Sequence, residues 1–198
     1  MYKLINKIDF IYIFKYKMYS HKQQLSQKII NIDKEPLIYK KENEKGISLF
    51  AKKSIKKGVP IIIYYGEINY KNEIYKEYIN DKENYIKNIG PYIRDINNNQ
   101  VVNGVKYLEN DNLNLCGVLV NDYSIIKNGD KIEMLIYIES KNNCNVEIIE
   151  TKDFPIYYST KKIKKDEEIC AHYGIGYWLL HIGIDADKIK DKINEIIL

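Results

Sequence analysis

The chain has 198 residues, a formal net charge of +4 and 45% hydrophobic residues. These values are typical of one soluble globular domain. They exclude wholesale disorder, and the 10 glycines and 3 cysteines exclude a collagen-like repeat and a disulfide scaffold. Isoleucine, lysine, asparagine and tyrosine supply more than half of the residues, a skew typical of AT-rich coding. The positive charge is therefore weak evidence for a nucleic-acid partner. The single arginine, Arg94, argues against base and phosphate recognition as the main role.

The cysteines and histidines give no pattern of a metal site. Cys116, Cys144 and Cys170 are widely spaced and form no C-x-x-C pair, which favours free thiols in a reducing compartment. The three histidines show no metal-ligand spacing. We therefore expect no metal and an intracellular location, without distinguishing nucleus from cytoplasm.

The first residues differ from the rest of the chain. Phe10 to Phe14 form an apolar run between lysines that is too short to span a bilayer and lacks the cleavage pattern of a secretory signal. We expect three parts: an N-terminal arm over 1–30, the main domain over 36–180 and a C-terminal helix over 184–198.

In chain order, the first half predicts short strands and one helix. Two short strands flank Gly46, a buried strand covers 60–68, and a helix covers 71–88 with Asn72 as N-cap. A hairpin follows, with strands at 92–95 and 100–102 around a turn at 97–99.

The second half continues the strand pattern. A buried apolar run at 115–120 precedes a loop over 122–133, and the expected strands are 134–139, 146–149, 155–160 and 169–173. The tail from Asp185, its expected N-cap, reads as a helix with Ile189, Ile193, Ile196 and Ile197 on its inner face. No βαβ alternation, glycine-rich phosphate loop or G-x-S-x-G elbow occurs, which argues against dinucleotide, P-loop and serine-hydrolase chemistry. The fold class is mainly β, with one inserted helix and a C-terminal helix.

Five sequence blocks then stand in a specific order. They are G-I-S-L-F-A at 46–51 leading to Gly58, Y-Y-G-E at 64–67, the hairpin from Tyr92 to Asn103, L-V-N-D at 119–122, and I-K-K-D-E-E-I-C-A-H-Y-G at 163–174, with G-Y-W at 176–178. Each block is weak alone. In this order and spacing they resemble the SET-domain family of protein lysine methyltransferases, over about Pro36 to Trp178.

This resemblance implies a fold and a reaction. The fold would be a knot-like β-clip of small sheets, in which an asparagine segment and a C-terminal tyrosine segment pack together and one strand passes under a loop. The cofactor would be S-adenosylmethionine. The substrate would be a lysine of a protein, a histone or another, entering from the opposite face. In-line methyl transfer needs positioning and a neutral amine rather than a metal or a covalent nucleophile.

The resemblance also assigns roles to residues. Tyr173 would be the catalytic residue, its hydroxyl beside the transferring methyl. Asn121 and the backbone of Asp122 would bind the cofactor, the latter at the adenine edge. The other implied cofactor contacts are Gly46, Ile47 and Ser48 through the backbone, Tyr92, Tyr173 itself, and Trp178, which would cover the adenine or only close the core.

Three departures leave an alternative open. Ser48 stands where the family has a second glycine, so its β-carbon could crowd the cofactor or force another backbone angle. Asp122 replaces the usual histidine, which would keep backbone recognition but lose side-chain bonds to neighbouring strands. Ala171 replaces a frequent aromatic residue. The second asparagine block could use Asn143 or Asn145. The alternative is a catalytically degenerate SET-like module that binds a protein partner.

Overall fold

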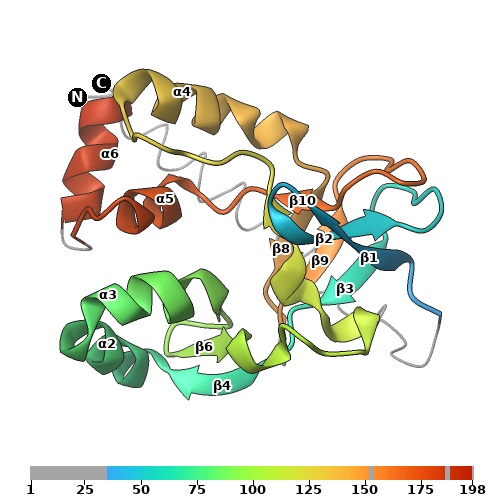
Figure 1. Cartoon of the computed structure of the whole chain (residues 1–198), viewed down its shortest axis with the longest axis horizontal. Helices are drawn as coiled ribbons and strands as arrows, with labels where there is room; N and C mark the ends of the chain where they lie inside the picture. Colours follow the sequence, from blue (N-terminus) through green and yellow to red (C-terminus); the bar gives the residue numbers. More distant parts are fainter. Residues whose placement is uncertain (1–34, 152–153, 186–187, 198) are drawn as a thin grey trace, which may run out of the picture. The chain divides into compact units, whose positions relative to one another are not determined.

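The computed structural model describes residues 35–151, 154–185 and 188–197. Over this part of the chain the strands form four small sheets rather than one large one (Figure 1). This confirms the β-rich assembly of small sheets. The predicted N-terminal arm over 1–30 lies outside the described residues, and the division into three parts stays a prediction.

The first sheet is the expected hairpin around Gly46. Strand β1 (Ile38–Asn43) pairs antiparallel with β2 (Gly46–Ala51), with Asn43 opposite Gly46. The Asn43 side-chain oxygen accepts from the Lys45 amide at 2.8 Å, and Gly46 has a φ of +89°, a left-handed conformation that suits glycine. The turn therefore fixes the start of β2 beside the site described below.

The predicted strand over 60–68 is two strands in two sheets. Strand β3 (Pro60–Ile63) pairs with β9 (Ile156–Ser159), which pairs with β8 (Val146–Ile149). Strand β4 (Glu67–Tyr70) pairs with β6 (Gln100–Asn103), which pairs with β5 (Ile93–Asp95). The chain changes sheets at Gly66, where a β-carbon would lie 2.2 Å from the Asn103 carbonyl oxygen. The predicted hairpin over 92–102 is confirmed.

The predicted helix over 71–88 is confirmed in its first part only. Helix α2 (Lys71–Asn80) ends at Asp81, whose side chain accepts from the Asn84 amide and starts the short helix α3 (Lys82–Asn84). A π-turn over 85–89 and a 3-10 turn over 90–92 follow. The predicted N-cap at Asn72 is wrong: the cap is Tyr70, whose amide donates to Glu73 at 3.2 Å.

The asparagine and tyrosine segments pack together, as expected. After 3-10 turns at 105–107, 113–115 and 117–119, strand β7 (Asn121–Asp122) pairs in parallel with β10 (Cys170–Ala171). The Tyr123 amide extends the contact by donating to the Ala171 carbonyl at 3.1 Å. Strand β10 is shorter than the predicted strand over 169–173. The passage of a strand under a loop stays a prediction.

The predicted strand over 134–139 is wrong, because these residues belong to helix α4 (Lys131–Glu139). The run M-L-I-Y-I is almost wholly apolar and suggested a buried strand, but the start signal lies upstream. The Asp130 side chain accepts from the Glu133 amide at 2.8 Å, which caps the helix. Helix α4 buries Met134 and Tyr137 and leaves Ile132 and Ile136 exposed. A further 3-10 turn covers Ser140–Asn143.

Two more helices follow β10. Helix α5 (Ile175–His181) was not predicted, whereas helix α6 (Ile189–Ile197) confirms the helical tail. The predicted N-cap at Asp185 is wrong, since α6 begins at Ile189 and the Asp185 carboxylate pairs with Lys82 and Lys188. Ile196 is buried, and Ile189 and Ile193 pack beside it, as the inner face requires. The side chain of Ile197 lies outside the described set.

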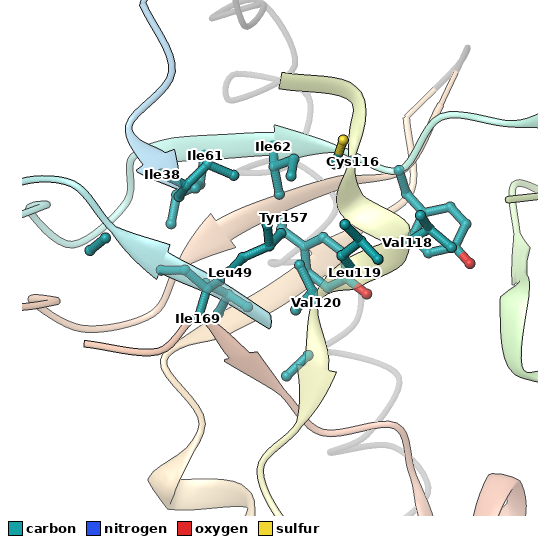
Figure 2. Close-up of a cluster of buried hydrophobic side chains, with 14 of the residues drawn as sticks. Ile38, Leu49, Ile61, Ile62, Cys116, Val118, Leu119, Val120, Tyr157 and Ile169 are labelled. Carbon is teal, nitrogen blue, oxygen red and sulfur yellow. The ribbon is translucent and has the colours of Figure 1, made fainter. Parts of the chain in front are cut away.

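Two hydrophobic cores hold these elements. The larger core lies among the hairpin, the β3-β9-β8 sheet and the run at 116–120; its members include Ile38, Leu49, Ile61, Ile62, Val120, Tyr157 and Ile169 (Figure 2). The smaller core joins α4, α5 and α6 through Met134, Tyr137, Trp178, Leu179 and Ile196. Cys116, Cys144 and Cys170 are buried free thiols. Over the described residues, every helix is too short or too polar to cross a bilayer.

Candidate functional site

Tyr173 follows strand β10 and is anchored at both ends. Its hydroxyl donates to the Val120 carbonyl at 2.6 Å, and its amide donates to Asp122 Oδ2 at 3.1 Å. Burial raises the pKa of the Tyr173 hydroxyl well above its usual range, although the nearby charge of Arg94 opposes the shift. The hydroxyl is therefore protonated at neutral pH and held in one place.

A cavity of about 460 Å³ lies on one side of Tyr173. Its lining includes six of the eight residues predicted to bind the cofactor: Ile47, Tyr92, Asn121, Asp122, Tyr173 and Trp178. Gly46 and Ser48 are not part of the lining. The sequence blocks, spread over more than 130 positions, thus meet around one hollow.

Ser48 lies behind this cavity rather than in it. Its side chain is fully buried, and its Oγ accepts from Asn121 Nδ2 at 2.6 Å. Among the described residues, the one non-glycine with a positive φ is Asp166, so Ser48 has no strained backbone. The serine therefore positions Asn121.

Asn121 uses only part of its amide in this arrangement. Its Nδ2 donates to Ser48 and, at 3.4 Å, to the Ile47 carbonyl. Over the described part of the chain no donor reaches its Oδ1, and Asn121 lines the cavity. An orientated acceptor is thus available to a ligand there.

The buried carboxylate of Asp122 joins several segments. Its Oδ2 accepts from the Tyr137 hydroxyl at 2.5 Å, the Trp178 indole N–H at 2.9 Å and the Tyr173 amide. These donors come from α4, α5 and the segment after β10 rather than from strands, and a carboxylate can accept from all three because it has several lone pairs. Burial, and the hydrogen bond to Asp122, raise the pKa of Tyr137.

A second cavity, of about 600 Å³, also reaches Tyr173. Its lining comes from β8, β9, the turn at 140–143 and the residues after β10, and it includes Arg94, Tyr157, Ala171, His172 and Gly174. Of the described residues, Tyr173 alone lines both cavities. Tyr173 is therefore the residue that the two cavities share.

The comparisons agree with this geometry. The family model of the SET domain matches residues 46–174. The chain belongs to the SET-domain family. The match spans β2 to the residue after Tyr173. It includes the whole lining of the second cavity and that of the first except Lys45, Tyr177 and Trp178.

Solved structures with a similar arrangement include two methyltransferases. One is a Plasmodium falciparum protein classed as a histone methyltransferase, with 21% identity, a TM-score of 0.42, and coverage of 73% of this chain and 99% of that one. The other is the methyltransferase domain of human PR domain-containing protein 2, with 14% identity, a TM-score of 0.46, and coverage of 72% and 80%. Similarity at this level says nothing about the activity of this SET domain. A search of the curated proteins finds no match.

The structure distinguishes between the two candidate asparagines of the second block. Asn145 is buried, its Oδ1 accepts from the Cys170 amide at 2.9 Å, and its Nδ2 donates to the Glu168 carbonyl at 2.7 Å. Asn143 is exposed at the end of a 3-10 turn. Asn145 therefore holds β10, and with it Tyr173, in place.

Sequence reasoning missed Lys45, which lines the first cavity together with Asn121. Its side chain is largely buried, and its Nζ donates to the Asp122 carbonyl at 3.2 Å and pairs with Glu168 at 3.3 Å. Lys45 thus ties the β1–β2 turn to the asparagine segment. It also donates to the backbone of Asp122, the residue whose backbone the resemblance places at the adenine edge. Its place directly before Gly46 was the available signal.

Arg94 was also missed as a site residue. Its Nη1 donates to the carbonyls of Pro91 at 3.1 Å and Ile93 at 2.7 Å, and its guanidinium lies 4.7 Å from the ring centre of Tyr173 and 5.3 Å from that of Tyr64. Within the described residues no carboxylate forms an ion pair with it. A lone arginine in a lysine-rich chain was the signal.

The described residues contain no group of three or more His, Cys, Asp or Glu side chains that could hold a metal ion.

Proposed function

We propose that this SET domain transfers a methyl group from S-adenosylmethionine to the ε-amine of a lysine in another protein. The observation that carries the proposal is the position of Tyr173, which lines two cavities and holds its hydroxyl by a 2.6 Å bond to Val120. A transfer between two bound ligands needs a fixed group at their meeting point.

The cofactor-side cavity fits S-adenosylmethionine in size and chemistry. Its 460 Å³ falls in the range of about 300 to 1,000 Å³ usual for small-molecule sites. Aromatic rings of Tyr92, Tyr177 and Trp178 offer surfaces for a flat base, and Asn121 Oδ1 offers an acceptor for an N–H or O–H. When bound, the cofactor supplies a methyl group on a positively charged sulfur, which is electrophilic.

The residues of the chain determine the rest of the reaction. Because Tyr173 is protonated and donates to Val120, the lone pairs of its oxygen stay available to accept from an N–H of the incoming amine. This contact orients the amine before transfer. Asp122 and Asn145 support the position of Tyr173 through its backbone and through β10.

The amine must also lose a proton. A lysine with a pKa of about 10.4 is only about 0.1% neutral near pH 7.4, a cost of roughly 4 kcal/mol. The guanidinium of Arg94 and the aromatic ring of Tyr157 line the second cavity, and both a nearby positive charge and poor solvation disfavour the ammonium form. The second cavity therefore favours the neutral, reactive amine.

The substrate is a protein lysine, and histone tails are one candidate class. The chemistry at Tyr173 requires only a lysine side chain long enough to reach it.

The test is a Tyr173→Phe variant. We expect it to fold and to bind S-adenosylmethionine like the wild type but to lose methyl transfer, since the ring remains and the hydroxyl does not. Incorporation of a labelled methyl group into an extract of lysine-containing proteins measures the activity, and thermal unfolding with and without cofactor measures binding, because a ligand of the native state raises stability. A folded wild type that the cofactor does not stabilise would favour the non-catalytic module instead.

A further inference from the structure

The charges around the second cavity have a clear imbalance. Its lining holds the cations Arg94, Lys141 and Lys161 but a single carboxylate, Glu147. The cavity on the cofactor side differs, since its lining holds one cation, Lys45, and two carboxylates, those of Asp122 and Glu109. The excess of positive charge is therefore a property of the second cavity rather than of the site as a whole.

The three cations are also not neutralised by their neighbours. Lys161 Nζ donates to the backbone carbonyls of Asn142 at 3.2 Å and Asn143 at 2.8 Å, which leaves one of its three N–H groups for a ligand. Lys141 is exposed on the same turn. Arg94 contacts carbonyls and tyrosine rings. Among the described residues, none of the three is in an ion pair.

The positions of these cations separate two roles. Arg94 lies over the Tyr173 ring and so acts on the amine that is to be methylated. Lys141 belongs to the turn at 140–143, and Lys161 belongs to the segment after β9. Both are placed to meet the residues that flank the target lysine rather than the lysine itself. Flanking cations would repel a basic tail and attract carboxylates.

We propose that the second cavity recognises a lysine flanked by acidic residues, with Lys141 and Lys161 binding the flanking carboxylates. This inference rests on the proposed function, because it takes the second cavity as the substrate side of Tyr173. It narrows the substrate class to acidic segments and disfavours the arginine- and lysine-rich surroundings of a basic tail.

Peptide binding tests this without turnover. Three fluorescent seven-residue peptides would carry one central lysine flanked by pairs of glutamates, serines or arginines. Fluorescence anisotropy at low salt would follow their binding to the full chain. We expect the glutamate peptide to bind about tenfold tighter than the arginine peptide, equivalent to about 1.4 kcal/mol, with the preference shrinking as salt screens the charges.

Matched variants assign the preference to the cavity. The double variant K141E/K161E should lose or invert the preference. The control K165E/K190E has the same net charge but changes two exposed lysines outside both linings, and it should keep the preference. A glutamate peptide with norleucine in place of lysine should bind at least as tightly, because the second cavity disfavours a charged amine and norleucine carries none.

Four results would overturn the inference: equal binding of the three peptides, tighter binding of the arginine peptide, binding of none, or an equal response of both double variants. The proposed function fails by a separate measurement, the absence of S-adenosylmethionine binding to folded protein, and the peptide preference can be read in either case.

Discussion

The two cavities that share Tyr173 were not equally predictable from the sequence. The wall of the cofactor-side cavity comes largely from the short motifs around Ile47, Asn121 and Trp178, each of which carries its own local signal. The wall of the second cavity brings together Arg94, Lys141, Tyr157 and Lys161, which no single motif links. A site built from short local motifs can thus be predicted from the sequence, whereas a site built from residues that no motif links can be recognised only from the fold.

The largest expected effect is on the carboxylate that supports both cavities. Asp122→Ala would leave the Tyr137 hydroxyl, the Trp178 N–H and the Tyr173 amide without their acceptor. We expect a loss of about 3 to 5 kcal/mol in the free energy of unfolding, the usual size for breaking a buried charged network. Urea unfolding measures it, with exposed Asp111→Ala as the control. A loss under 1 kcal/mol would show that Asp122 does not join the segments.

A change at Arg94 should distinguish the roles of the two cavities, because it should lower methyl transfer without changing cofactor affinity. Arg94→Met removes the positive charge near the incoming amine, and Arg94 itself is not part of the lining of the first cavity. We expect methyl transfer at pH 7.5 to fall about tenfold, the effect of raising the pKa of the bound amine by about one unit. Cofactor affinity should not change, and activity should recover at higher pH. A uniform loss at every pH, or a loss of cofactor binding, would contradict this role; Arg94→Lys should retain most of the activity.

A smaller change acts on the cofactor side alone. Ser48→Ala removes the 2.6 Å bond to Asn121 without altering the second cavity. We expect about fivefold weaker binding of S-adenosylmethionine, equivalent to about 1 kcal/mol for one buried hydrogen bond. Calorimetry measures the affinity, and turnover at saturating cofactor should not change. Unchanged affinity in Ser48→Ala would remove the positioning role of this serine.

A final prediction concerns the thiols beside the second cavity. Burial raises the pKa of Cys170 to about 12 and that of Cys144 to about 11. Because the unfolded thiols lose their protons near pH 8.5, the unfolded state binds fewer protons than the folded state above that pH, and stability must fall as pH rises. We expect the free energy of unfolding, measured with urea, to fall between pH 8 and pH 10, and to fall less in Cys170→Ser. A flat profile would contradict the burial of these thiols.

Particular residues show why some elements could be predicted. The hairpin around Gly46 and the turn at 97–99 carry local turn chemistry, so both were found. Helix α4 was read as a strand because its apolar run M-L-I-Y-I has no clear period. What makes it a helix is its cap at Asp130 and the burial of Tyr137 against distant Asp122.

In the candidate site, too, residues in local motifs could be predicted and contacts between distant residues could not. Tyr173 and Asn121 could be predicted as candidate site residues because each lies in a short motif, and the motifs follow one another in a specific order. The contacts that position them could not be predicted, because Ser48, Asn145 and Lys45 act through bonds to residues 25 to 123 positions away. The side-chain contacts of Asp122 could not be predicted either, because two of its donors, Tyr137 and Trp178, lie on helices that the sequence did not predict.

The measurement that tests the central claim most directly is calorimetric titration of S-adenosylmethionine into the wild type, Asn121→Ala and Tyr173→Phe. If the cavity lined by Asn121 holds the cofactor and Tyr173 acts at the junction with the second cavity, the wild type and Tyr173→Phe will bind it with similar affinity. Asn121→Ala will bind at least tenfold more weakly. No binding by folded wild type, or binding that survives in Asn121→Ala and is lost in Tyr173→Phe, would contradict this account.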